Sequence, residues 1–314
     1  MKLSILLVCI TLLFSCTSSR YIAQPQPLQT ENLPVPDTEV EIENIGSCTD
    51  SEDRTLKFNA NYPLTVLVHG CNGSAGRFRS LAQLYAFHGQ QAVCYSYDDR
   101  DRLTKSADKL VTALNKLVSV SSNENITVIG HSMGGLIARK AMENKRLNSE
   151  LNINLITVSA PLAGIAAAST CALRPLHWLS LGIVPAVCWG ITGDNWYEIT
   201  SQSDFIKYPA PLSSSVLRYL KIVTNEQNTC RRIDSEGNCV ESDYVFELDE
   251  QYQPVIDGYR QVTNIQVDAG HVEIVGYKDV EPRKLLTILQ QENMISGTPV
   301  ERQAELELLL SQLY

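Results

Sequence analysis

The chain has 314 residues, of which 44% are hydrophobic and 19% are charged, and its net charge is −9. This length and apolar content exclude an intrinsically disordered chain and are sufficient for a large buried core. The 35 acidic and 26 basic residues argue against nucleic acid as a partner, because a surface that binds nucleic acid needs a basic patch. Nine cysteines are too many for an ordinary cytosolic enzyme of this size and too few for a disulfide scaffold.

The N-terminus has the pattern of an export signal. Lys2 precedes an apolar run from Leu3 to Phe14, which is too short to span a hydrocarbon core of about 30 Å. The sequence Leu13-Phe14-Ser15-Cys16 resembles a bacterial lipobox, in which the cysteine becomes the lipidated first residue of the mature protein. We therefore expect a signal peptide over 1–15 and an exported lipoprotein that is anchored to a bacterial membrane, periplasmic or surface-facing, through Cys16. The alternative is an ordinary cleaved signal without lipid.

Residues 16–50 are expected to form a flexible tether. They carry four of the thirteen prolines, together with many Gln, Thr and Glu residues, and have little apolar surface to bury. The folded domain is accordingly predicted over 51–314.

Beyond residue 60, short β-branched runs alternate with segments of helical periodicity. This rhythm predicts an α/β fold with a mostly parallel sheet that is covered by helices on both faces. The expected strands are 64–68, 91–97, 125–129, 153–158, 216–223 and 260–267, and the expected helices are 77–88, 103–120, 133–145, 279–291 and 299–313.

Residues 162–214 interrupt this rhythm. All three tryptophans lie here, with five alanines between residues 163 and 172 and the pair Cys171 and Cys188. We interpret the insertion as a lid packed over a site, with an irregular extension of the core as the alternative.

The segment Gly130-His131-Ser132-Met133-Gly134 lies between a predicted strand and a predicted helix, which is the context that makes G-x-S-x-G informative. The nucleophile of such a motif needs a sharp strand-to-helix turn, and the two glycines relieve the crowding there. Ser132 is therefore the expected nucleophile. The amide of Met133, at the start of the helix, is directed to where an oxyanion would form.

With this motif the chain resembles the α/β-hydrolase family, in particular its bacterial lipases and esterases. A second matching stretch is Val68-His69-Gly70-Cys71-Asn72-Gly73, and the resemblance implies that the amide of Cys71 is the other oxyanion donor. A third is Ser159 to Gly164, which is similar to a stretch of bacterial lipases and of GPI-inositol-deacylase-like proteins. The resemblance covers most of residues 60–280 and implies the α/β-hydrolase fold.

The family order of nucleophile, acid and histidine selects the base. Three of the five histidines precede Ser132, and His177 falls in the tryptophan-rich insertion. His271 follows the last predicted strand in a Gly-His turn, so we expect it to be the catalytic base.

The acid is expected after the 216–223 strand and before His271, where it would orient the imidazole. Ser242-Asp243-Tyr244-Val245 resembles the family's Asp-Gly-x-Val segment, which favours Asp243. The alternatives are Asp234, Glu241, Asp249, Asp257 and Asp268.

The signal and the lipid anchor account for Cys9 and Cys16 and leave seven cysteines in an oxidising compartment, enough for three disulfides and one thiol. The expected pairs are Cys71–Cys94, Cys171–Cys188 and Cys230–Cys239, with Cys48 as the odd residue.

The sequence lacks the spacing of a zinc site and a nucleotide-binding glycine loop, so we expect no metal and no cofactor. The expected activity is that of a serine hydrolase on lipid or other acyl esters. The same triad could instead cleave a thioester, an amide or the acyl group of a phospholipid or GPI. A binding lipoprotein without turnover is the alternative from another class of function.

Overall fold

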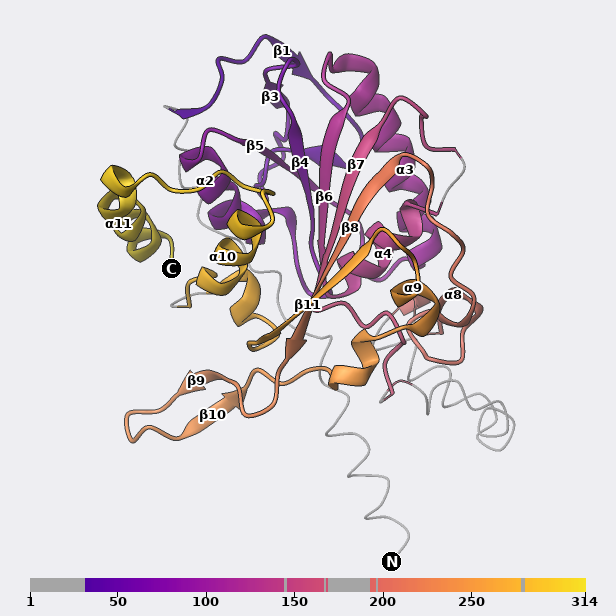
Figure 1. The fold of residues 1–314 in the computed structure, drawn as a ribbon, viewed down its shortest axis with the longest axis vertical. Coiled ribbons are helices and arrows are strands. Elements are labelled where there is room, and N and C mark those ends of the chain that lie inside the picture. Colours follow the sequence, from indigo (N-terminus) through magenta and orange to yellow (C-terminus); the bar gives the residue numbers. More distant parts are fainter. Residues whose placement is uncertain (1–31, 144–145, 167, 169–192, 196, 278–279) are drawn as a thin grey trace, which may run out of the picture.

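A seven-stranded sheet forms the centre of the computed structural model, which describes all residues except 1–31, 144–145, 167, 169–192, 196 and 278–279 (Figure 1). All neighbouring strands are parallel except the edge strand β2, which is antiparallel to β5. In sheet order the strands are β11 (Val262–Asp268), β8 (Val216–Asn225), β7 (Asn152–Val158), β6 (Asn125–His131), β4 (Leu64–Val68), β5 (Gln91–Tyr95) and β2 (Ile45–Gly46).

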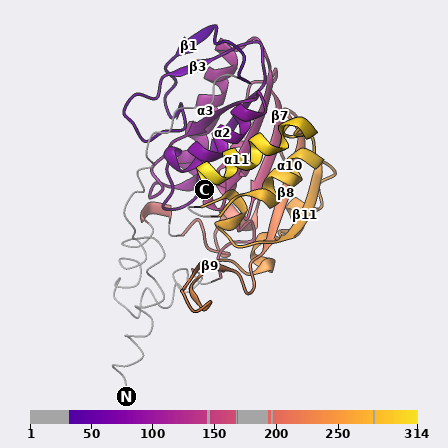
Figure 2. The same ribbon diagram turned by 90° about the vertical axis from the view of Figure 1, so that its left-hand side faces the viewer.

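Helices cover both faces of this sheet, as Figures 1 and 2 show. One layer contains η3 (Ala75–Phe78), α2 (Arg79–Phe87), α10 (Arg283–Gln291), η7 (Val300–Arg302) and α11 (Gln303–Leu313). The other contains α3 (Leu103–Val120), α4 (Met133–Ala141), α8 (Asp204–Lys207) and α9 (Pro254–Asp257). The chain thus has the predicted α/β architecture.

Each face of the sheet has its own hydrophobic core, because successive side chains of a strand point to opposite faces. In β4, Val66 and Val68 pack with α3 and α4, whereas Leu67 packs with α2, α10 and α11. All five residues of β4 are buried and four of them are apolar, as expected of a strand that is covered on both faces.

The predicted elements agree with the structure apart from their ends. The predicted helix over 103–120 coincides with α3. The helix expected from residue 279 begins instead at Arg283, with Pro282 as its N-cap. Strand β8 continues to Asn225, two residues beyond the predicted end, and this difference affects the site described below.

The folded region begins before residue 51, so the predicted boundary of the tether is too late. Strand β1 (Thr38–Val40) pairs with β3 (Leu56–Phe58), and β2 joins the edge of the main sheet. The pairing of Gly46 with Cys94 brings Cys48 to Cys94, and these two cysteines form a disulfide. The expected Cys71–Cys94 bond is therefore wrong, and Cys71 forms no disulfide within the described residues.

The predicted Cys230–Cys239 disulfide is present and closes a hairpin of β9 (Cys230–Ile233) and β10 (Cys239–Ser242). In Figure 1 this hairpin projects from the end of the sheet at which β8 and β11 finish.

Several predictions fall outside the described residues. They are the signal peptide, the anchor at Cys16 and the Cys171–Cys188 pair. About half of the expected lid over 162–214, including 169–192, is also outside. Its described part includes η4 (Gly193–Asn195) and α8. Within the described part of the chain, no helix is long and apolar enough to cross a membrane.

The two disulfides among the described residues differ in the length of chain that they close, 46 residues for Cys48–Cys94 and 9 for Cys230–Cys239. Replacing Cys48 and Cys94 together with alanine is expected to lower the free energy of unfolding by about 2–4 kcal/mol, because the longer loop restricts the unfolded chain more. The measurement is urea unfolding without reductant. The matched control is the double alanine variant of Cys230 and Cys239, for which we expect a smaller loss; equal losses would contradict the prediction.

Candidate active site

Four polar side chains follow the carboxyl ends of four strands at one edge of the sheet. Parallel strands end at the same edge, which is where ligands of open α/β sheets bind. All four residues are buried. They are Ser132 after β6, Ser159 after β7, Glu226 after β8 and His271 after β11.

Ser132 occupies the sharp turn that the motif predicts. Its backbone has φ 55° and ψ −127°, an unfavourable conformation for a residue with a side chain, and it is the N-cap of α4. A Cβ atom on Gly130 would collide with the carbonyl of Gly134, and one on Gly134 would collide with the carbonyls of the β4 end. The glycines therefore allow the turn to pack against β4. Met133 is the first residue of α4, so its amide is at the positive end of the helix.

The loop after β4 lies directly against Ser132. A Cβ atom on Gly70 would be 2.9 Å from Cβ and 3.4 Å from Oγ of Ser132, so only glycine fits there. The loop is held by Tyr97, whose hydroxyl donates to the carbonyl of His69 at 2.6 Å and whose ring stacks on the imidazole at 4.3 Å between centroids. The structure thus brings the segment that contains Cys71 beside the predicted nucleophile.

The ring of His271 lies between two aromatic rings. Phe246 meets it edge-on and His131 at an angle of 42°, each with 4.8 Å between ring centroids. His131, the residue before Ser132, also donates from Nε2 to the carbonyl of His271 at 2.8 Å. This bond connects the nucleophile turn to the histidine loop.

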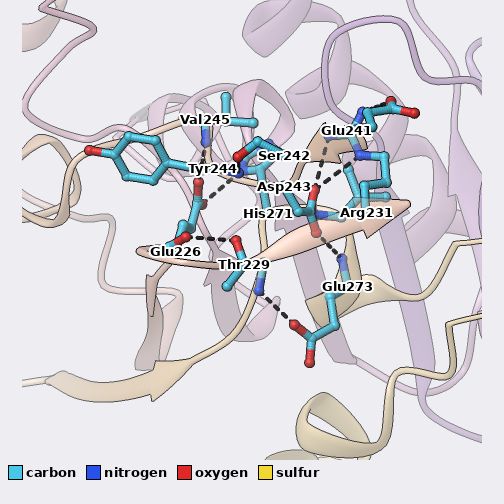
Figure 3. Close-up of polar contacts among 12 residues, drawn as sticks. Glu226, Thr229, Arg231, Glu241, Ser242, Asp243, Tyr244, Val245, His271 and Glu273 are labelled. Atoms are coloured by element: carbon cyan, nitrogen blue, oxygen red, sulfur yellow. Dashed lines mark hydrogen bonds and ion pairs between the residues drawn. The ribbon is translucent and has the colours of Figure 1, made fainter. Parts of the chain in front are cut away.

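The carboxylate at the imidazole belongs to Glu226 and not to Asp243. Oε1 of Glu226 lies 2.9 Å from Nδ1 of His271, and Oγ of Ser159 lies 2.8 Å from the same nitrogen. The expectation that Asp243 orients His271 is therefore corrected. Figure 3 shows both carboxylates and their different partners.

The carboxylate of Glu226 is surrounded by hydrogen-bond donors. Oε1 also accepts from the hydroxyls of Ser159 at 2.6 Å and Thr224 at 3.0 Å, and Oε2 accepts from the amides of Val245 at 2.7 Å and Phe246 at 2.9 Å. Burial by itself would raise the pKa of Glu226. The hydrogen bonds and the nearby imidazole outweigh burial and hold the pKa below its usual value, so Glu226 is ionised at neutral pH.

Asp243 instead fixes the backbone on both sides of His271. Its carboxylate accepts from the amides of Val272 at 3.1 Å and Glu273 at 2.9 Å, at the start of the short helix η6 (Glu273–Val275). It also accepts from the guanidinium of Arg231 at 3.0 Å. Its own carbonyl accepts from the amide of His271 at 2.9 Å. The sequence signal at Asp243 therefore marked the loop that carries the histidine (Figure 3).

Glu226 was not among the expected acids, although it follows the predicted strand end at residue 223 and precedes His271. The apolar run ends at residue 223, but β8 continues through Thr224 and Asn225. A search for the first carboxylate after the strand would have found Glu226. Within the described residues, no group of three or more His, Cys, Asp or Glu side chains could hold a metal ion.

A family model described as palmitoyl protein thioesterase matches residues 64–244, more than half of the chain. The chain belongs to this family. The match includes Ser132 and Glu226 and ends before His271.

Solved structures show the same fold. The mature form of the Bacillus licheniformis lipase BlEst2 is 16% identical with a TM-score of 0.52, and the match covers 79% of this chain and 96% of that one. The propeptide form is also 16% identical with a TM-score of 0.54, over 81% of this chain and 54% of that one. A search of curated protein sequences gave no match. Together these matches identify a member of the palmitoyl protein thioesterase family with the α/β-hydrolase fold.

The first prediction from the site distinguishes the role of Glu226 from that of Asp243. Glu226→Gln is expected to lower kcat for ester hydrolysis on the order of 10³-fold, because the imidazole loses its charged partner and its fixed tautomer. Asp243→Asn keeps that partner. It is expected to lower the unfolding free energy by about 1–3 kcal/mol while kcat falls much less. Steady-state kinetics and urea unfolding of both variants provide the measurement; a larger kcat loss for Asp243→Asn would contradict the assignment.

A second prediction concerns pH. Burial, followed by the neighbouring charge of His271, lowers the pKa of His131 from 6.5 to about 3. Between these two pH values His131 is protonated in the unfolded chain and neutral in the native chain. The contribution of the neutral His131 to the free energy of unfolding is therefore complete above pH 6.5 and is lost as the pH falls toward 3. His131→Gln should therefore flatten the decline of Tm between pH 6.5 and 4. Parallel Tm curves for the variant and wild type would contradict this.

Proposed function

We propose that this protein is a serine hydrolase that cleaves acyl esters through an acyl-enzyme on Ser132. The observation that carries the proposal is the contact between Glu226 and His271, placed at the sheet edge beside the strained turn of Ser132. This combination matches the arrangement of a nucleophile, an oriented base and a buried acid. A protein that only bound lipid would not need it.

In this mechanism Ser132 Oγ attacks the acyl carbonyl and its proton passes to Nε2 of His271. The other ring nitrogen keeps its proton, which points to Glu226, and the ionised carboxylate stabilises the imidazolium. The amides of Cys71 and Met133 donate to the oxyanion, supported by the proximity of Gly70 to Ser132 and by the start of α4. The intermediate collapses, the leaving group takes the proton from His271, and water then hydrolyses the acyl-enzyme with His271 as base.

A thioester is the second candidate for the bond that is cleaved. The family match favours it, because the family model is described as palmitoyl protein thioesterase. The same residues serve both reactions, since both proceed through an acyl-enzyme on serine. An acyl chain of the length of palmitate would agree with the apolar composition of the expected lid.

We also propose that the protein is exported and anchored to a membrane through Cys16. The short apolar run before Cys16 supports this, and two disulfides agree with an oxidising compartment. Mass spectrometry of the mature N-terminus would test it; a mature chain without lipid at Cys16 would overturn the anchor.

The mechanism predicts that Ser132→Ala lowers kcat for a p-nitrophenyl ester on the order of 10⁴-fold and abolishes labelling by a serine-directed phosphonate. The control is the folded state of the variant, checked by its Tm. Full ester hydrolysis by a folded Ser132→Ala variant, or no labelling of the wild type, would exclude the mechanism. Palmitoyl-coenzyme A and p-nitrophenyl palmitate, assayed side by side, distinguish the thioester from the oxygen ester.

A further inference from the structure

Strand β7 lies between the strands that precede the nucleophile and the acid. It is followed by Ser159, to which the mechanism above gives no role. Ser159 has no exposed surface, and its backbone φ is 47°. A positive φ is uncommon for a residue other than glycine and is found where the surroundings enforce it, often at functional sites. Its amide donates to the carbonyl of Ile222 at 2.9 Å, so the turn continues the β7–β8 ladder and directs the side chain to the end of β8.

The hydroxyl of Ser159 lies between the acid and the imidazole. Oγ is 2.6 Å from Oε1 of Glu226 and 2.8 Å from Nδ1 of His271. A carboxylate accepts only, so the one hydroxyl proton of Ser159 points to Glu226. The Ser159 oxygen then accepts from Nδ1 of His271 and from Thr224, whose one hydroxyl proton is shared between Ser159 Oγ at 2.8 Å and Glu226 Oε1 at 3.0 Å.

Thr224 is itself fixed. Its amide donates to the side-chain oxygen of Gln251 at 2.9 Å, and its carbonyl accepts from the side-chain amide of Gln251 at 2.8 Å. The hydroxyl of Thr224 is therefore held toward Ser159 and Glu226, and it directs the Ser159 proton to the carboxylate. Thr224, Gln251 and Ser159 are all buried, so water does not compete for these bonds.

We propose that Ser159 is a positioning residue that shares the Nδ1 proton of His271 with Glu226, so that the imidazole is held by two acceptors instead of one. This inference rests on the proposed function, because it assigns His271 as the base. Two acceptors on different strands restrict the rotation of the ring more than one carboxylate does. They also keep the proton on Nδ1, and Nε2 is thereby left to accept the proton of Ser132.

The proposal has a consequence for the pH dependence. The hydrogen bond that Ser159 donates to Glu226 does not involve the proton that the ring gains, so it is present in both states of His271. The bond that Ser159 accepts from Nδ1 is stronger when the ring is charged. Removing the hydroxyl therefore destabilises the charged ring more than the neutral ring. The other titratable groups around His271 are His131 at its ring, and Asp243 and Glu273 at the backbone of its loop; these remain unchanged.

The test uses the purified full-length protein with a p-nitrophenyl ester. Ser159→Ala and Ser159→Gly both remove the hydroxyl, but glycine relieves the positive φ and alanine does not. We expect kcat to fall about tenfold in both variants, with KM within about twofold, because a hydrogen bond to a charged group is lost in the transition state. The acidic limb of the kcat/KM profile should move to lower pH by about half a unit in both.

The matched control is Thr157→Val. It removes another buried hydroxyl of β7, one that contacts the hydroxyl of Tyr219 at 3.1 Å and lies two residues before Ser159. If the proposal holds, Thr157→Val leaves the acidic limb of the kcat/KM profile unmoved, although its Tm should fall. The proposal is overturned if Ser159→Gly restores wild-type kcat while Ser159→Ala does not, because strain alone would then explain the loss. An unmoved acidic limb in both Ser159 variants overturns it as well.

If neither Ser159 variant folds, Thr224→Val decides. It removes the hydroxyl that orients Ser159 and leaves the turn at Ser159 unchanged. A shift of the acidic limb to lower pH supports the proposal, and an acidic limb at the wild-type position overturns it. A different result would overturn the proposed function: wild-type protein that hydrolyses the ester no faster than the Ser132→Ala variant.

Discussion

The arrangement of the site depends on the burial of one carboxylate. Glu226 has 1% of its surface exposed and sits at the end of a central strand, where an unpaired charge would be very unfavourable. Its two oxygens are satisfied by an imidazole, two hydroxyls and two backbone amides, which come from β7, β8 and the segments on either side of β11. The groups that stabilise this charge are thereby held at fixed positions, and His271 is one of them.

Asp243 is equally buried but has a different role, because its partners differ. Its donors are backbone amides of the turn after His271 and the guanidinium of Arg231, a residue of the projecting hairpin. One carboxylate thus contacts the imidazole ring, and the other contacts the backbone that carries the ring. The disulfide between Cys230 and Cys239 closes the hairpin from which Arg231 extends, so a surface element contributes to the stability of the histidine loop.

The strained backbone at the carboxyl ends of β6 and β7 is also held by hydrogen bonds to neighbouring strands. Ser132 and Ser159 both have positive φ, and both follow a strand whose neighbour accepts a hydrogen bond from their amide. The parallel ladder therefore continues through each turn and aims each side chain along the edge. Without these hydrogen bonds, nothing would offset the unfavourable positive φ of the two serines.

Local sequence was sufficient for much of the fold and for part of the site. The alternation of apolar runs and helical periodicity predicts the parallel sheet, since both faces of such a sheet are covered and its inner strands are mostly apolar. The glycines around Ser132 and the Gly-His turn at His271 are local requirements of a tight turn, so they are visible in the sequence. The disulfide of the hairpin is also local, because its cysteines are only 9 residues apart.

Contacts between distant segments had to be decided by the tertiary structure. The partner of Cys94 is Cys48 because β2 pairs with β5, and a two-residue edge strand has no detectable periodicity. The partner of His271 is Glu226 because β8 and β11 run in register to Asn225 and Asp268, which places the next residue of β8 beside the histidine loop. The sequence by itself determined which residue types could carry the chemistry and in what order. Only the packing of the strand ends, where each buried charge must find its donors, decided which carboxylate faces the imidazole.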